Sequence, residues 1–199
     1  MSGFYEGIRY EYPLTETDVV VDVGAHRGDF AFAIANRYGC KVFALEPIKR
    51  FYDEMHGRRQ EELKRGVIVF VHSGLGAKGR MEKMGVHGAM TGVFCVQDDS
   101  ETVPIMSISK LLFGISGSDE PARVALLKLN CEGMEFEILE EMLNLPCIDL
   151  FDNLQIQWHN VFEGAPERRQ KIIDRLSQTH RPTFDFEWVW QNWRRKCLP

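Results

Sequence analysis

Short runs of apolar residues alternate along this chain with longer amphipathic stretches. Apolar runs of this length predict strands buried on both faces, and apolar residues at helical spacing predict the helices that cover them. The strands are expected at residues 19–23, 41–45, 67–71, 124–129, 154–158 and 183–188. The helices are expected at residues 29–38, 48–64, 134–143 and 166–178, and a polar, aromatic tail follows the last strand.

This alternation of strand and helix is typical of an α/β fold with a doubly wound, mostly parallel sheet and helices on both faces. We therefore expect a Rossmann-like architecture. The length favours a single domain spanning residues 1–199. Residues 73–117 break the alternation because they are rich in glycine, serine and methionine. They predict an irregular or β insertion, with strands at 80–84 and 92–97 and a short helix at 108–113.

The composition is that of an ordinary globular protein, with 44% hydrophobic and 27% charged residues. The formal net charge of −5 argues against a nucleic-acid partner, because phosphate binding needs a basic surface. The five cysteines form no C-x-x-C pair, which predicts reduced thiols in a cytoplasmic compartment rather than disulfides or a zinc site. No apolar run approaches the ~18 residues of a membrane span, so neither membrane insertion nor secretion is expected.

A glycine turn follows the first predicted strand, where open α/β sheets bind their ligands. Gly24 and Gly28 give the turn its room for a close ligand. It is not the dinucleotide pattern G-x-G-x-x-G, because Ala25 and His26 occupy positions that need glycine. Asp22 at the strand end opposes a phosphate and suits a cationic ligand, such as the sulfonium and ammonium groups of S-adenosylmethionine (SAM). Alternatively, Asp22 caps or braces the turn.

Charged residues also mark two other strands. Glu46 ends the second strand about 20 residues after the glycine turn, where a carboxylate can accept both hydroxyls of a ribose. Alternatively, Glu46 caps the following helix. Lys128 interrupts an apolar strand, which is costly unless its charge is paired or solvated. Glu132 or Glu135 is the expected partner, in a structural ion pair that shapes the next turn.

The segments VVVDVGAHRGDFAFAIA, VFALEP and LLKLNCEGMEFEIL resemble the FkbM-type family of class I SAM-dependent methyltransferases. That family pairs a D-x-G-A-x-x-G turn and an E-P strand end with a K-x-D-x-E-G-x-E segment. The resemblance covers roughly residues 18–160 and implies SAM as methyl donor. It also implies O-methylation of a hydroxyl on a small-molecule or glycan acceptor, such as a sugar or polyketide. The positions that match these motifs are Asp22, Gly24, Glu46, Lys128, Glu132, Gly133 and Glu135.

The sequence departs from the family pattern in two places. Asn130 stands where the family usually has Asp, which weakens a role as base or metal ligand, although its amide oxygen can still position a hydroxyl. The chain also ends soon after the sixth predicted strand. An antiparallel seventh strand, found in many class I methyltransferases, therefore has little room. We expect a sheet edge that is shortened or completed by a partner, as in a homodimer.

The candidate site residues fall into two groups. The cofactor-binding residues are expected to be Asp22, Gly24, His26, Gly28, Glu46 and Asn130, with His26 near the methionine part of SAM. The catalytic residues are expected to be His159, Glu132 and Asn130. His159 follows the fifth strand and is the leading general base for an aliphatic hydroxyl, with Glu132 next. No metal site is predicted; metal assistance by Asn130, Glu132 and His159 or Asn160 is an alternative.

Two apolar regions have open roles. Met81, Met84, Met90 and Phe94 in the insertion either form an adaptable wall beside the acceptor or pack on the sheet edge. The tail over residues 184–193 either stacks on a sugar or, as we expect, packs against the last helix or a second copy.

Two other functions compete with methyl transfer. The first is a nicotinamide-dependent oxidoreductase, against which Asp22 and the missing glycine triplet count. The second is a methyltransferase-like module that binds without catalysis, or a partner subunit. Asn130 and the short C-terminal region keep that second possibility open.

Overall fold

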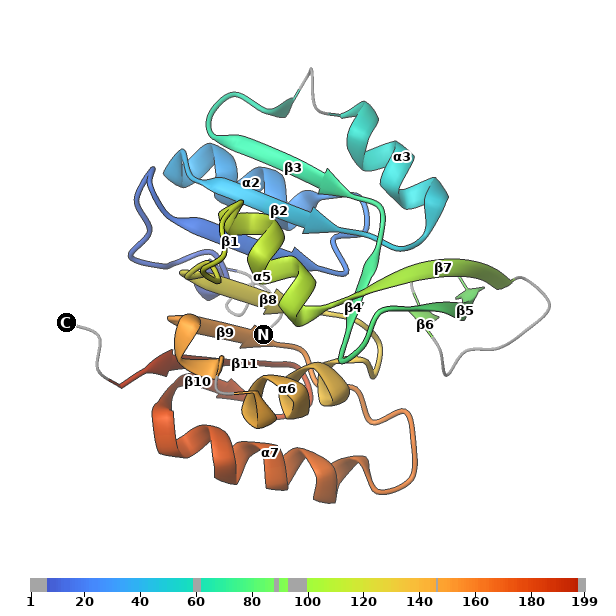
Figure 1. The fold of residues 1–199 in the computed structure, drawn as a ribbon, viewed down its shortest axis with the longest axis vertical. Coiled ribbons are helices and arrows are strands. Elements are labelled where there is room, and N and C mark those ends of the chain that lie inside the picture. Colours follow the sequence, from blue (N-terminus) through green and yellow to red (C-terminus); the bar gives the residue numbers. More distant parts are fainter. Residues whose placement is uncertain (1–6, 59–61, 88–89, 93–99, 146, 197–199) are drawn as a thin grey trace.

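A seven-stranded sheet forms the centre of the protein (Figure 1). The structure is a computed structural model that describes residues 7–58, 62–87, 90–92, 100–145 and 147–196. The strands are β1 (Val19–Val23), β2 (Lys41–Leu45), β3 (Val67–Val71), β8 (Leu126–Leu129), β9 (Asn153–Ile156), β10 (His180–Phe186) and β11 (Trp190–Arg195), in the order β10-β11-β9-β8-β1-β2-β3. The pairs among β9, β8, β1, β2 and β3 are parallel. This confirms the doubly wound α/β fold.

Helices cover both faces of the sheet and bury alternate strand residues. The helices are α2 (Asp29–Tyr38), α3 (Lys49–Gly57), α5 (Ile108–Ser116), α6 (Glu135–Asn144) and α7 (Ala165–Thr179), with a short 3-10 helix at Ile148–Leu150. Val20 packs in the core under α2, whereas Val21 packs in the core under α5, α6 and α7. This division follows from the two-residue period of a strand. No helix in the described part of the chain is long and apolar enough to span a membrane.

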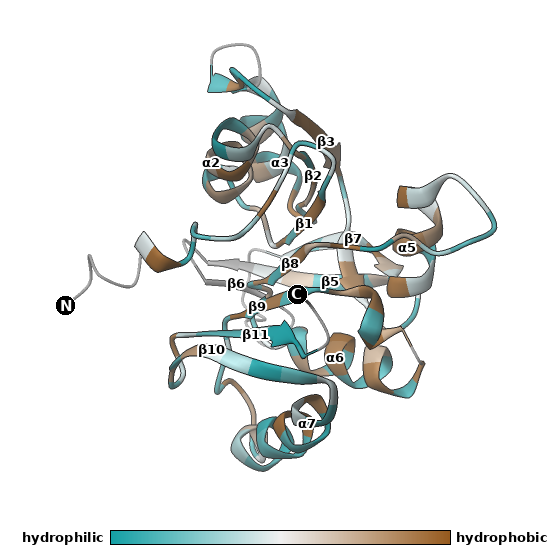
Figure 2. Cartoon of the chain, turned by 90° about the vertical axis from the view of Figure 1, so that its left-hand side faces the viewer, coloured by the Kyte–Doolittle hydropathy of each residue, from teal (hydrophilic) through white to brown (hydrophobic). Residues whose placement is uncertain are grey.

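The tail forms a seventh strand, so the expectation of a shortened sheet edge is wrong. β11 lies between β9 and β10 and is antiparallel to both. Its sequence, WQNWRR, mixes aromatic and polar residues and therefore does not predict a strand in the interior of the sheet. The buried polar side chains are satisfied: Gln191 Oε1 accepts hydrogen bonds from the indoles of Trp158 and Trp193 at 2.9 and 2.8 Å. In Figure 2, β10 and β11 are largely teal, unlike the brown strands at the sheet centre.

The insertion folds into a second sheet of four strands. These are β4 (Gly74–Gly76), β5 (Arg80–His87), β6 (Met90–Gly92) and β7 (Ser100–Ser107), in the order β4-β7-β5-β6. Figure 1 shows this sheet beyond the carboxyl ends of the central parallel strands. Met84 packs into the core, whereas Met81 is 62% exposed and belongs to no wall. The side chains of Met90 and Phe94, and most of the strand expected at 92–97, lie outside the described residues.

Replacing Trp193 by alanine should destabilise the protein by about 3–5 kcal/mol, because its side chain is 3% exposed and fills the core under β11. Urea denaturation measures the loss. Val189→Ala, at a position 44% exposed, is the control and should change little. Equal midpoints for the two variants would mean that β11 is not part of the cooperative core.

Candidate active site

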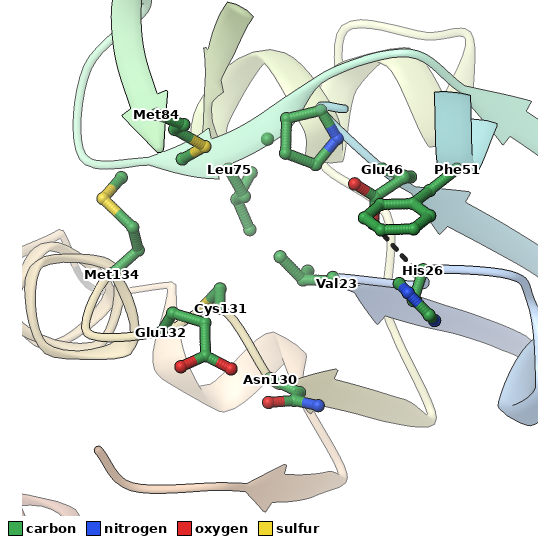
Figure 3. A pocket seen from close by; sticks show the side chains of 13 residues that line it. Val23, His26, Glu46, Phe51, Leu75, Met84, Asn130, Cys131, Glu132 and Met134 are labelled. Carbon is green, nitrogen blue, oxygen red and sulfur yellow. Dashed lines mark hydrogen bonds between the residues drawn. The ribbon is translucent and has the colours of Figure 1, made fainter. Parts of the chain in front are cut away.

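A pocket opens where the carboxyl ends of β1, β2 and β8 meet the second sheet (Figure 3). Parallel α/β sheets place their ligand sites at this edge. The lining residues are Val23, Gly24, His26, Glu46, Pro47, Phe51, Gly74, Leu75, Met84, Asn130, Cys131, Glu132 and Met134. Five of the predicted site residues are therefore brought together: Gly24, His26, Glu46, Asn130 and Glu132. Asp22, Gly28 and His159 do not line the pocket.

The glycine turn after β1 lies directly against the turn after β8. Gly24 has a φ of +69°, and a Cβ built there would overlap the carbonyl oxygen of Asn130. Only glycine allows both the conformation and this approach. Gly28 has a different task, since a Cβ there would lie 2.7 Å from Met55 Cγ of α3. It serves helix packing beside the turn.

A buried ion pair supports the glycine turn from below. Lys128 Nζ lies 2.7 Å from Asp22 Oδ1, with side-chain exposures of 4% and 0%. The same ammonium donates to the carbonyl oxygen of Gly24 at 2.9 Å. The expected partners of Lys128, Glu132 and Glu135, are therefore wrong. Asp22 therefore lies in the position of a turn brace, the alternative considered from sequence, and does not line the pocket.

The Glu46 carboxylate lies in the pocket and accepts two backbone N–H groups. Its Oε2 accepts the backbone N–H of His26 at 2.7 Å, and its Oε1 accepts the N–H of Ile48, at the start of α3, at 2.9 Å. The side chain lines the pocket and is 5% exposed. Burial raises the pKa of Glu46 to about 7, against the opposing effect of the two backbone donors and Lys128.

His26 and Phe51 form the wall beside Glu46. The imidazole lies over the Phe51 ring with the centroids 4.0 Å apart. Burial, followed by the nearby charge of Arg27, lowers the pKa of His26 and keeps its ring neutral. Phe51 was not predicted as a site residue, because the sequence alone does not distinguish an aromatic pocket residue on a helix from an ordinary core residue.

The turn after β8 presents Asn130 and Glu132 to the pocket. Asn130 Oδ1 is buried, and no donor in the described part of the chain reaches it. Glu132 has a φ of +50°, a left-handed conformation that is uncommon for its residue type. Glu135, which is fully buried, holds this turn by accepting the N–H of Gly133 at 2.8 Å.

His159 lies between two carboxylates. Its backbone N–H and Nδ1 lie 2.8 and 3.1 Å from Glu135 Oε1, and its Nε2 lies 3.4 Å from Glu132 Oε1. Burial lowers the pKa of His159, but the hydrogen bonds and charges of Glu132 and Glu135 outweigh this and raise it to about 9. A protonated imidazole cannot accept a proton. This argues against His159 as general base near neutral pH and leaves Glu132 and Glu46 as the carboxylates that line the pocket.

Other groups add little chemistry. Burial holds the pKa of the Cys131 thiol well above its usual range, so it is a wall residue rather than a nucleophile. The described residues contain no group of three or more His, Cys, Asp or Glu side chains that could hold a metal ion.

The model of the FkbM methyltransferase domain matches residues 22–186. The chain belongs to the FkbM methyltransferase family. Its cofactor is accordingly SAM, which removes the nicotinamide-dependent alternative. A comparison with curated proteins finds no match.

Solved structures of methyltransferases share the fold of this FkbM protein. A protein described as an rRNA methylase from Clostridium thermocellum has a TM-score of 0.54 at 10% identity, over 98% of this chain and 96% of that chain. A fibrillarin/Nop5p complex gives a TM-score of 0.53 at 10% identity, over 98% and 79%. At this identity the likeness shows the class I methyltransferase fold alone.

The side chains that line the pocket match the chemical groups of a SAM-type cofactor. Glu46 offers a buried carboxylate to ribose hydroxyls, and Gly24 leaves its backbone bare toward the ligand. Asn130 supplies a buried oxygen without a donor, which the ammonium of the methionine part would satisfy. We infer that these three residues would hold the cofactor.

Lys128→Met should cost about 3–5 kcal/mol of stability, because it leaves the Asp22 carboxylate buried and unpaired. The double variant Asp22→Leu/Lys128→Met should recover most of this loss. Binding of S-adenosylhomocysteine (SAH) should stay weak in both, since Gly24 has lost the donor to its carbonyl. Chemical denaturation and calorimetry measure the two effects. If the double variant recovered SAH affinity together with stability, Lys128 would not be needed to position the turn.

Glu46 should make stability depend on pH. Its pKa rises from an ordinary 4.5 to about 7 on folding, so the folded state favours the protonated acid. The contribution of Glu46 to the free energy of unfolding is therefore fully present below pH 4.5. It falls by about 3 kcal/mol as the pH rises through 7. Glu46→Gln should remove this slope while weakening SAH binding. Parallel stability–pH curves for the two proteins, measured by urea denaturation, would contradict the assignment.

Proposed function

We propose that the protein is an O-methyltransferase that methylates a hydroxyl of a small-molecule or glycan acceptor. The observation that carries this proposal is the presentation of Glu132 to the cofactor pocket beside Asn130. The left-handed backbone of Glu132 is uncommon, and such conformations persist where the surrounding structure enforces them, often at functional sites.

SAM supplies a methyl group already activated by its sulfonium. The remaining work belongs to the chain: it must align the acceptor oxygen with that methyl and remove the hydroxyl proton. As the new O–C bond forms and the S–C bond breaks, the acceptor oxygen becomes positive and its proton becomes strongly acidic. A carboxylate is then basic enough, and Glu132 accepts the proton. The products are a methyl ether and SAH.

His159 acts through Glu132 in this scheme. Its protonated ring faces Glu132 on one side and the buried Glu135 on the other, which fixes its orientation. The imidazole ring holds the carboxylate of Glu132 in place. His159 is therefore proposed as a positioning residue, a change from the base predicted by sequence.

The net charge of −5 favours an uncharged or cationic acceptor over a polynucleotide. Two similar structures are an rRNA methylase, by description, and a fibrillarin/Nop5p complex. RNA is for this reason a necessary arm of the test. The alternative function is a non-catalytic binding module. It would be recognised by SAH binding without methyl transfer to any acceptor.

The test is transfer of isotope-labelled methyl groups to a panel of glycans, hydroxylated small molecules and RNA, with mass spectrometry of the product. We expect methyl ethers in the first two groups. Glu132→Gln should lower kcat by about 10²–10⁴-fold, with SAH affinity unchanged. Glu163→Gln, at an exposed position after β9, is the matched control. Labelled RNA, or full activity of Glu132→Gln, would overturn the proposal.

A further inference from the structure

The second sheet forms one wall of the cofactor pocket. Leu75 comes from β4, Met84 from β5, and Met134 from the turn before α6, and all three line the pocket. Figure 3 shows Met84 and Met134 at the end of the pocket away from Phe51 and His26. The second sheet and the turn before α6 therefore meet at this end of the pocket.

The carboxylate of Glu137 on α6 binds the second sheet. Glu137 Oε1 accepts the backbone N–H of Ala77 at 3.1 Å and Arg80 Nη1 at 2.9 Å. Its Oε2 accepts Arg80 Nη2 at 3.2 Å, so the guanidinium is bound by both oxygens. Arg80 is itself oriented by Glu82, which accepts its Nε at 2.7 Å. Bidentate arginine–carboxylate pairs fix geometry as well as adding energy.

The pair also lies against the pocket lining. Arg80 Nη2 is 3.8 Å from the sulfur of Met134. Gly76 permits the arrangement, because a Cβ there would overlap Glu137 Oε1 and lie 3.0 Å from Arg80 Nη1. The sequence of β4 is thus suited to a carboxylate entering from α6.

We propose that Arg80 and Glu137 are positioning residues that hold the second sheet closed over the pocket and set the rate at which SAH leaves. Separating the pair frees the β4–β5 turn from α6 and lets Met84 move away from Met134. The inference rests on the cofactor site of the family and not on the identity of the acceptor. A failure to find O-methylation would therefore leave this inference unaffected.

The decisive variant is Glu137→Gln, which removes the charge facing Arg80 but keeps an acceptor for Ala77. Stopped-flow displacement should show SAH leaving about fivefold faster, which corresponds to ~1 kcal/mol for a partly exposed pair. Glu140→Gln is the matched control. Glu140 lies on the same helix, binds Arg168 through two 2.6 Å contacts, and has similar exposure. It faces α7, so SAH release should not change.

Two further measurements keep the proposal falsifiable. Gly76→Ala places a Cβ against both Glu137 Oε1 and Ile105 Cγ2 without removing a charge, and should speed SAH release as Glu137→Gln does. Hydrogen exchange of the β4 amides in the ligand-free protein should accelerate in both variants and remain unchanged in Glu140→Gln. Equal release rates for Glu137→Gln and Glu140→Gln, or unchanged β4 exchange, would overturn the proposal. Arg80→Met combined with Glu137→Gln should add nothing to either single change.

Discussion

The buried ion pair between Asp22 and Lys128 is the constraint on which the site depends. The two residues are direct neighbours in the β1–β8 register, and both side chains are almost completely removed from water. Such a pair is costly to bury, and leaving one charge alone costs more. Lys128 offsets part of this cost by also donating to the Gly24 carbonyl. One ammonium thus joins the two central strands and fixes the glycine turn, which brings Gly24 and Asn130 into contact at the mouth of the pocket.

The same register continues as a polar row on one face of the sheet. Lys128 pairs with Gln155 of β9, and Gln155 pairs with Asn192 of β11. The Tyr12 hydroxyl accepts from Gln155 Nε2 at 2.6 Å and donates to Asn192 Oδ1 at 3.2 Å. Burial raises the pKa of Tyr12, so it stays a neutral donor. This row explains how a strand as polar as β11 can be buried beside β9, because each polar side chain meets a partner across the sheet.

Sequence reasoning succeeded where the signal is local. The strand–turn–helix pattern at Gly24 and the strand end at Glu46 depend on neighbours within the same βα unit, so period and spacing reveal them. It failed where the deciding partner is distant. Lys128 pairs with a residue more than one hundred positions away, and only strand order reveals that neighbour. β11 lacks the apolar alternation of a strand, since Gln191 and Asn192 are satisfied by tertiary contacts. The protonation of His159 likewise depends on Glu135, which lies on another βα unit.

Glu135 shows why the two halves of the site should be considered together. It is fully buried and accepts hydrogen bonds from the turn after β8 and from the chain after β9. The first contact supports the left-handed Glu132, and the second fixes the ring of His159 that faces Glu132. Strain in one turn is therefore balanced by a carboxylate one helical turn further along the chain. One helix therefore supplies the carboxylate that supports Glu132 and His159 and, two residues later, the Glu137 carboxylate that binds the second sheet.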